Sequence, residues 1–278
     1  MNTGVLPVPV VPELMRDRDR LDGVATVQKA LQLLEAIADR GSSTARELSA
    51  SLGIPLPTVY RLAQELVKRG YLVHLKAEYK FELGYKLYGL GVSLHRQIAA
   101  SSEVRAAIDE LHNTVEMAAY FAIYRGADVV VTYVSDCAEH RRLSPLKFGF
   151  HEAAHATAFG KIMLAGMSIE QRDEYLQVHG TPQLADATIA DRATLEDVLA
   201  KVALRGVAWE REEFMPGKSC AAVGVRGASG LITGAVAISM DADAIDGSEE
   251  RQVEVRLREY AGLISRYYRA ESNSLALS

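Results

Sequence analysis

The feature of this sequence that most constrains its fold is the break Gly53-Ile54-Pro55 between two short segments with helical apolar spacing. Glycine and proline together stop a helix, and only about three residues then separate the two segments. Two short helices joined by so tight a turn are typical of a helix-turn-helix. The apolar residues that recur on the two sides of the break are Ala45, Leu48 and Leu52, then Val59, Leu62 and Leu66.

The flanking segments complete this first domain, which we place at residues 22–83. Upstream, an apolar stripe at helical spacing predicts a longer helix that ends at Gly41. Downstream, Gly70 stops the third helix, and residues 71–73 and 79–83 are typical of a small β-hairpin. Three helices followed by a hairpin predict a winged helix-turn-helix. The stripe of the first helix consists of Val27, Ala30, Leu31, Leu34 and Ile37.

Polar side chains on the outward side of the third helix are suited to phosphates and base edges. Residues 22–96 carry ten lysines and arginines against seven aspartates and glutamates, whereas the chain from residue 98 onward carries eighteen against twenty-six. Only the front of a chain whose net charge is −5 is therefore suited to DNA. The predicted DNA-binding residues are Arg46, Thr58, Tyr60, Arg61, Gln64, Lys68, Lys76 and Lys80.

Beyond the first domain we expect a helical connector at residues 84–101 and an α/β domain at 102–270. Leucines spaced along the connector predict packing against another helix, either in a partner subunit or within the same chain. Residues 1–21 and 271–278 are predicted to be flexible tails. The expected fold is therefore a two-domain α/β chain whose second domain has an antiparallel six-stranded sheet with helices on one face. Its strand-like runs are 117–124, 129–134, 143–148, 207–212, 220–225 and 231–240.

Cysteine content and hydropathy exclude several classes of protein. Cys137 and Cys220 are too few for a disulfide framework or a cysteine-based metal site, so a reducing cytoplasm is expected. The start of the chain lacks the pattern of a signal peptide. The longest apolar run, 231–240, falls short of the roughly 20 residues that a membrane span needs. No cofactor is predicted.

One motif favours a different function. His151-Glu152-Ala153-Ala154-His155 matches the H-E-x-x-H pattern, which on a helix supplies two zinc ligands and a general base. A zinc-dependent hydrolase is therefore the alternative function, although residues 147–150 suggest a strand leading into a loop. A third possibility is a sensor whose first domain contacts only other proteins.

Several strings, in matching order across both domains, resemble the IclR family of transcription regulators from Val24 to about Tyr268. Any one of them alone is a weak signal, but the two sets together are specific. In the first domain they include Leu52-Gly53-Ile54-Pro55 and Thr58-Val59-Tyr60-Arg61-Leu62, and in the second His155-Ala156-Thr157-Ala158-Phe159-Gly160-Lys161 and Glu213-Phe214 followed by Pro216-Gly217 and Cys220.

The resemblance implies a DNA-binding regulator, more often a repressor, that forms homodimers or homotetramers. It also implies a GAF/PAS-like domain that binds a small organic or aromatic acid between the sheet and the helix of the His-Ala-Thr-Ala motif. The chain departs from the family at Leu56-Pro57 and Ala153-Ala154, and the bulk of Phe159 would reduce the cavity. The effector-binding residues that the resemblance implies are Thr157, Ala158, Phe159, Glu210, Cys220, Ala237 and Ser239.

The residues themselves favour binding of an anion at this site. A helix that starts near Ala156 presents free N–H groups to a carboxylate, and the hydroxyls of Thr157 and Ser239 add donors. Arg141 is either a charged clamp or a solvated surface residue, and we place Ser144 in the same site. An acidic Glu210 would repel an acid, so it is expected to act through its backbone or to face solvent. The predicted function is thus a cytoplasmic, ligand-responsive transcription regulator and not an enzyme.

Overall fold

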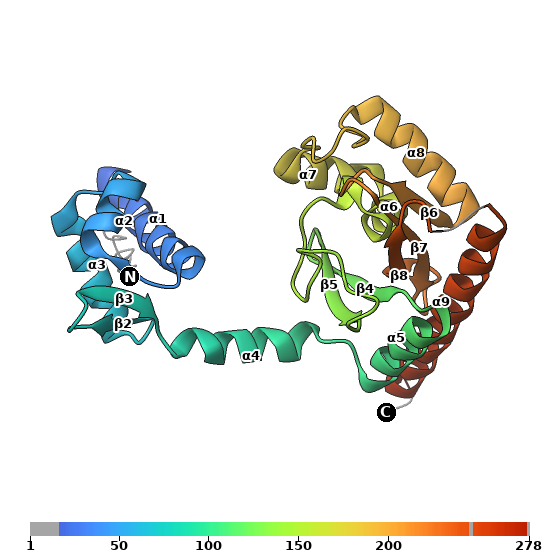
Figure 1. The fold of residues 1–278 in the computed structure, drawn as a ribbon, viewed down its shortest axis with the longest axis horizontal. Coiled ribbons are helices and arrows are strands. Elements are labelled where there is room, and N and C mark those ends of the chain that lie inside the picture. Colours follow the sequence, from blue (N-terminus) through green and yellow to red (C-terminus); the bar gives the residue numbers. More distant parts are fainter. Residues whose placement is uncertain (1–16, 245–246, 277–278) are drawn as a thin grey trace, which may run out of the picture. The chain divides into compact units, whose positions relative to one another are not determined.

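The computed structural model describes residues 17–244 and 247–276 of the chain. The chain divides into two compact units, which meet between Gln97 and Ile98 and are considered separately (Figure 1). The first unit holds α1 (Asp17–Arg40), β1 (Ser43–Thr44), α2 (Ala45–Leu52), α3 (Leu56–Lys68), β2 (Leu72–Leu75), β3 (Lys80–Leu83) and most of α4 (Lys86–Ile98).

The first unit has the predicted winged helix-turn-helix fold. Helix α2 begins at a capping box, in which the N–H of Glu47 donates to Thr44 Oγ1 at 3.3 Å and the N–H of Thr44 donates to Glu47 Oε2 at 2.7 Å. Gly53 ends α2 with a φ of +64°, a conformation that glycine adopts without strain. Because α3 begins directly after Pro55, the turn between the two helices is as short as the sequence predicts.

The wing contains one strand more than the predicted hairpin. Its sheet has the order β1-β3-β2, and Ser43 pairs with Phe81. A two-residue strand is too short to show an alternating pattern, so it could not be predicted. The core beneath the sheet and the three helices contains Leu33, Ile37, Leu48, Val59, Leu72 and Phe81.

Two expectations for α1 are wrong. The helix already begins at Asp17, inside the predicted tail, because no proline or glycine interrupts residues 17–22; residues 1–16 of that tail lie outside the described residues. The predicted single apolar stripe is in fact divided between two faces. Leu33 and Ile37 are buried, whereas Val27 and Leu31 lie on the outer face with more than half of their surface exposed.

The second unit is built on one antiparallel sheet with the strand order β5-β4-β8-β7-β6. Each strand alternates its side chains between two faces, and both faces are apolar. The elements of this unit are α5 (Ser102–Val115), β4 (Ala118–Arg125), β5 (Asp128–Ser135), a 3-10 helix (Ala154–Ala156), α6 (Ala158–Gly166), α7 (Ile169–His179), α8 (Arg192–Arg205), β6 (Val207–Arg211), β7 (Lys218–Arg226), β8 (Ile232–Asp241) and α9 (Gly247–Ala276).

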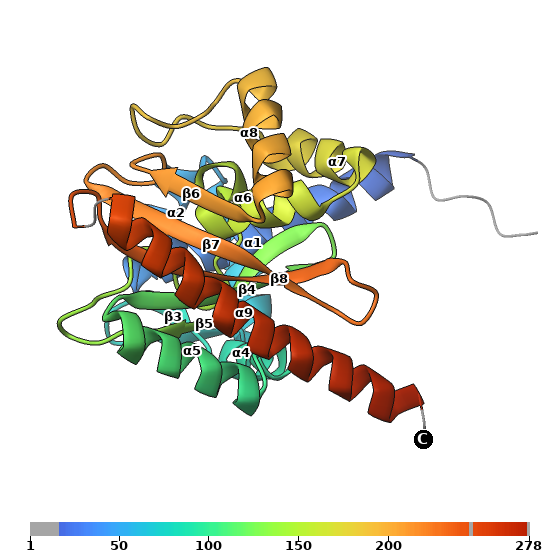
Figure 2. The same cartoon turned by 90° about the vertical axis from the view of Figure 1, so that its right-hand side faces the viewer.

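Helices cover both faces of this sheet. The expectation that they cover only one face is wrong. On β4, Tyr120 joins the core beneath α6 and α8, and its neighbour Phe121 joins the core beneath α5 and α9. Figure 2 shows α9 crossing the sheet with α5 beside it. The apolar character of both faces is typical of a sheet buried between two helical layers.

The sheet has five strands among the described residues, so the predicted sixth strand at residues 143–148 is wrong. This segment is a loop, which contacts β4 where the N–H of Leu143 donates to the Tyr120 hydroxyl at 2.9 Å. The residues directly after it contact β5, where the N–H of Val131 donates to Phe150 O and the N–H of Gly149 donates to Val131 O, each at 2.8 Å. Its apolar residues are buried because the loop covers the end of the core, which explains the strand-like pattern. They are Leu143, Leu146 and Phe150.

Helix α9 is longer than the sequence indicates. It continues to Ala276 through most of the predicted C-terminal tail, of which residues 277–278 lie outside the described residues. The predicted helix start near Asp246 also lies outside them. On the inner face of α9, Val253, Leu257 and Ile264 recur at helical spacing and pack on the sheet.

Candidate DNA-binding surface and effector site

Helix α3 presents a polar face outside the core of the first unit. Val59, Leu62 and Ala63 point into the core, so residues on the opposite side of the helix are turned outward. Among the predicted DNA-binding residues, this places Tyr60, Arg61, Gln64 and Lys68 in exposed positions. The face carries two cations and can therefore meet the negatively charged groove of DNA.

The remaining predicted DNA-binding residues are arranged less uniformly. Arg46 on α2 and Lys76 at the turn of the wing are exposed. Thr58 is half-buried in the first turn of α3, and Lys80 is half-buried with its ammonium 3.5 Å from Glu78. The assignment of all eight residues to DNA contact stays a prediction.

In the second unit, the sheet aligns several of the predicted effector residues in one row. Glu210 on β6 pairs with Cys220 on β7, which in turn pairs with Ser239 on β8. The adjacent row on the same face contains Ala222, Ala237 and Tyr120. The alanines leave a shallow surface, above which α6 packs.

The N-terminus of α6 lies inside this unit. Thr157 is the N-cap residue and is buried, but its hydroxyl makes no capping hydrogen bond and has no partner among the described residues. The side chains that follow, Ala158 and Phe159, are buried as well. This buried hydroxyl and the free N–H groups of the helix start are hydrogen-bond donors that an anion can use.

A buried charged cluster lies next to this helix end. Lys161 of α6 is fully buried and forms an ion pair with Glu213 in the loop after β6. Glu210 Oε1 accepts hydrogen bonds from the N–H groups of Glu213 at 2.6 Å and Phe214 at 2.9 Å. The sequence motifs contain both Lys161 and Glu213, but we assigned neither a role. A buried lysine that needs a carboxylate is the signal that would have identified the pair.

Burial changes the titration of this cluster. Burial raises the pKa of Glu210 above the ordinary value of a glutamate. It also raises the pKa of the Cys220 thiol well above the ordinary value of a cysteine. Cys220 therefore remains a protonated thiol, which disfavours redox reactivity. The side chain of Glu210 is also inside the protein, so the expectation that it faces solvent is wrong. The second oxygens of Glu210 and Glu213 have no hydrogen-bond partner among the described residues.

Tyr120, in the adjacent row, contacts the Ser239 end of this row, a role that the sequence analysis missed. Its hydroxyl lies 2.9 Å from Ser239 Oγ and accepts a hydrogen bond from the N–H of Leu143, also at 2.9 Å. Burial raises the pKa of Tyr120 to about 12, so the phenol stays neutral. The tyrosine thus connects the sheet to the loop that covers it.

The two remaining predicted effector residues lie outside the buried row. Arg141 is exposed, donates from Nε to Ala138 O at 3.2 Å, and lines a hollow of about 510 Å³ together with Ser239. Ser144 is also exposed and lines a different hollow of about 490 Å³, beside Phe150 and Phe214. Cys220 lines neither of these two hollows.

The geometry contradicts the zinc-hydrolase alternative. His151 and His155 do not share a helix, because Ala153 between them has a φ of +56°. His151 is exposed, whereas His155 is buried with its Nε2 3.0 Å from Pro182 O. Burial lowers the pKa of His155, which favours its neutral form. Among the described residues, no group of three or more histidine, cysteine, aspartate or glutamate side chains is arranged to hold a metal ion.

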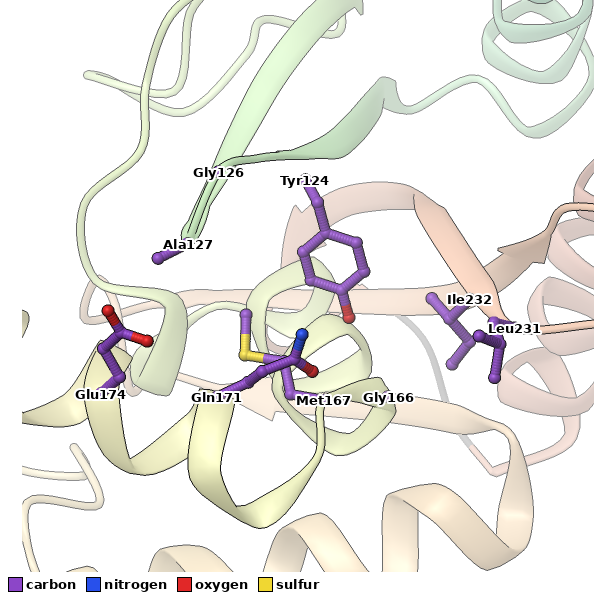
Figure 3. Close-up of a pocket in the computed structure, with 9 residues that line it drawn as sticks. All are labelled: Tyr124, Gly126, Ala127, Gly166, Met167, Gln171, Glu174, Leu231 and Ile232. Atoms are coloured by element: carbon purple, nitrogen blue, oxygen red, sulfur yellow. The ribbon is translucent and has the colours of Figure 1, made fainter.

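A further hollow of about 470 Å³ lies at the β4–β5 turn and contains none of the predicted site residues. Figure 3 shows Tyr124 above it, facing Met167, which follows α6, and Gln171 in the first turn of α7. The Tyr124 hydroxyl donates to Met163 O. Because this phenol is held by the backbone, we assign the hollow no role in binding.

The first unit is a winged helix-turn-helix whose third helix has an exposed polar face, and the second unit contains a row of buried polar side chains. Together they define a one-component DNA-binding regulator. Comparison with known families agrees. Residues 26–75 match the IclR helix-turn-helix domain, and residues 93–266 match the C-terminal domain of the bacterial transcriptional regulator IclR. The chain belongs to the IclR family of transcription regulators.

Individual relatives are distant but cover most of the chain. The HTH-type transcriptional regulator XynR of Escherichia coli is 23% identical over 87% of this chain and 96% of its own. The crystal structure of Thermotoga maritima IclR has a TM-score of 0.69 at 22% identity, and covers 88% of this chain and 99% of that one. An IclR homologue from Microbacterium hydrocarbonoxydans, complexed with 4-hydroxybenzoate, has a TM-score of 0.68 at 23% identity, with 88% and 99% covered.

A search of the described part of the chain for membrane spans found no helix with the length and apolar character to cross a bilayer.

Proposed function

We propose that this regulator binds its operator through the outward face of α3 and that a small organic or aromatic acid in the second unit modulates that binding. The observation that carries the first half is the exposure of Tyr60, Arg61, Gln64 and Lys68 on a helix whose other side is fixed in the core. In this proposal Arg61 makes a bidentate contact with guanine and Lys68 contacts a phosphate. Repression, the family's more common mode, is the expected result of operator binding.

The unpaired polar atoms in the second unit support the effector half of the proposal. The carboxylate of the acid accepts hydrogen bonds from the Thr157 hydroxyl and from the N-terminal N–H groups of α6. In this proposal the aromatic body lies over the small side chains of Ala222 and Ala237, on the face of the sheet that α6 covers. The relative crystallised with 4-hydroxybenzoate makes hydroxybenzoates the first probes to use.

We further propose that a second copy of the chain covers the exposed apolar side chains of the first unit. On α4, Leu90 is 50% and Leu94 is 48% exposed, and they are spaced one helical turn apart. On α1, Val27 and Leu31 repeat this spacing. An operator with two half-sites is read by two recognition helices, so a homodimer, or a homotetramer built from it, fits this surface. A cytoplasmic location remains a prediction from the DNA target and the unpaired cysteines.

The DNA half of the proposal is tested with Arg61→Ala in the full-length chain, on an operator recovered by selection from random DNA. Loss of one base contact per half-site is expected to weaken binding by about 1–3 kcal/mol for each half-site. The charge-matched control is Lys29→Ala on α1, which is outside the predicted DNA-binding set. Equal affinity of Arg61→Ala and the native protein at the same salt concentration would exclude α3 as the reading helix.

The effector half is tested by thermal unfolding of the full-length protein with a panel of benzoate, 4-hydroxybenzoate and short aliphatic acids. A bound acid raises the melting temperature because it binds only the folded state. If no acid of the panel raises it at millimolar concentration, small acids are not the effector. That outcome leaves the DNA half of the proposal intact.

A further inference from the structure

A second polar hollow in the C-terminal unit lies apart from the row that carries Glu210, Cys220 and Ser239. It has a volume of about 360 Å³ and lies between the C-terminal end of α8, strand β7 and helix α9. Three arginines line it, Arg226, Arg258 and Arg269, and no aspartate or glutamate is among the described residues that do so. We call it the arginine hollow.

This concentration of cations is unexpected for the unit that contains it. Residues 98–278 carry eighteen lysines and arginines against twenty-six aspartates and glutamates, a local charge of −8. Other arginines of this unit are paired with a carboxylate, as Arg256 is with Glu259 at 2.9 Å. Three arginines around one hollow that carboxylates do not line indicate a site for a negative ligand.

The fold builds the hollow from one stripe of α9 and the edge of β7. Residues 258, 262, 265 and 269 are spaced by four, three and four, so they share one face of the helix. Ser265 Oγ accepts a hydrogen bond from the N–H of Arg226 at 2.9 Å, which fixes the strand to this face. Gly262 in the middle of the stripe has no side chain, and this leaves the space between Arg258 and Arg269 open.

Two of the three guanidinium groups are held in place by backbone oxygens. Arg258 Nη2 donates to Arg205 O at the end of α8, and Arg226 Nη1 donates to Gly230 O, both at 2.9 Å. The carboxylate of Glu254 lies near the hollow without lining it, with its Oε2 4.0 Å from Arg258 Nη2. A guanidinium has five N–H donors, so these contacts orient the groups and leave donors for a ligand.

We propose that the arginine hollow binds a small phosphoryl-bearing molecule, as a second ligand site of this regulator. Its volume fits a small molecule, and three arginines match the charge and the oxygens of a phosphate dianion better than those of a single carboxylate. A DNA backbone is a poorer occupant, because the net charge of the unit repels a polyanion of that length. The ligand connects α8, β7 and α9, so binding stabilises the packing of α9 on the sheet.

The test is calorimetric titration of the full-length protein with inorganic pyrophosphate and, in a separate arm, with citrate at the same ionic strength. We expect pyrophosphate to bind with a Kd below about 1 mM and more tightly than citrate. Gly262→Glu places a carboxylate in the hollow at a helical position that accepts a side chain, since the nearest atom to its Cβ is Arg266 Nη1 at 3.7 Å. This variant should fold normally and bind pyrophosphate at least about tenfold more weakly.

Two further variants separate this site from a general charge effect. Arg226→Ala combined with Arg269→Ala should also weaken binding at least about tenfold, whereas Arg256→Ala, on another face of α9, should leave the Kd within about twofold. The proposal is overturned if pyrophosphate does not bind at about 10 mM, or if Gly262→Glu binds it as well as the native protein. It is also overturned if citrate binds more tightly, or if Gly262→Glu weakens operator binding in the absence of pyrophosphate, because the arginines would then contact DNA.

Discussion

The two units of this regulator place their functional polar side chains in opposite environments. In the first unit, Arg61 and Lys68 lie on the surface of a helix whose inner side is apolar. In the second unit, Thr157, Lys161 and Glu210 are buried, and two of the three have an oxygen without a hydrogen-bond partner among the described residues. A surface that reads DNA keeps its charges hydrated until DNA arrives, whereas an internal ligand site lowers the stability of the free protein.

The largest effect is expected from breaking the buried ion pair of the second unit. Lys161→Met leaves the Glu213 carboxylate buried without its counter-ion, which should lower the free energy of unfolding by about 3–5 kcal/mol. Urea unfolding followed by the fluorescence of Trp209, the single tryptophan, reports on this unit. Lys201→Met, on the exposed side of α8, is the matched control.

The double variant Lys161→Met with Glu213→Gln removes both charges and should recover part of the lost stability. If Lys161→Met is as stable as the control, the pair is not buried as described, and the contrast between the two units is lost.

The next effect concerns the apolar surface of the first unit. Leu90→Asp with Leu94→Asp places two charges in the proposed subunit contact and should raise the dissociation constant of the dimer by about thirtyfold or more, or about 2 kcal/mol. Analytical ultracentrifugation measures this change. Leu204→Asp, which changes a more exposed leucine on α8, should leave the dimer intact. An unchanged oligomer in the double variant would exclude α4 from the contact.

A smaller effect is expected from the unpaired hydroxyl at the start of α6. Thr157→Val keeps the shape of the side chain but removes the donor, so the affinity for an acid that binds there should fall by about tenfold. The free protein should be at least as stable as the native one, because the lost oxygen had no partner. Thr233→Val on the exposed part of β8 is the control. Weaker folding with unchanged acid affinity would make Thr157 a structural residue only.

The smallest effect is a pH dependence at Glu210. Its folded-state pKa is raised above the ordinary 4.5 by burial, so its contribution to stability is lost as the pH rises through the folded-state value. Glu210→Gln removes this loss and still accepts the two backbone hydrogen bonds. The stability of the variant relative to the native protein should therefore increase as the pH rises above 4.5, as followed by Trp209 fluorescence. Glu152→Gln on the surface is the control. If the stability difference between Glu210→Gln and the native protein stays constant with pH, the Glu210 carboxyl is not desolvated.

The contrast between the units also explains what could be predicted from the sequence. The first unit depends on local signals, namely the Gly53-Ile54-Pro55 break and the helix stops at Gly41 and Gly70, and its fold followed from them. The outward direction of Val27 and Leu31 could not be predicted, because helical spacing does not distinguish a core face from a partner face.

In the second unit, the relevant pairs are distant in the chain. Lys161 and Glu213 meet only after the sheet has formed, and no spacing rule connects them. Residues 143–148 of the loop have a strand-like pattern because their apolar side chains are buried, and the predicted strand is therefore wrong. The positions that the family resemblance implies for the effector are all buried, whereas Arg141 and Ser144, which we placed in the site apart from that resemblance, are exposed. The role of both sets in binding stays a prediction.

The most direct test of the account is a measurement of linkage in the full-length protein. The acid of the panel that raises the melting temperature most is held at saturation, and the operator Kd is measured with and without it by fluorescence anisotropy. Because both ligands act on one equilibrium, the acid must change the operator Kd by the same factor by which the operator changes the Kd of the acid. We predict equal factors, both different from one. An acid that binds tightly while the operator Kd stays constant would contradict the claim that the second unit controls the first.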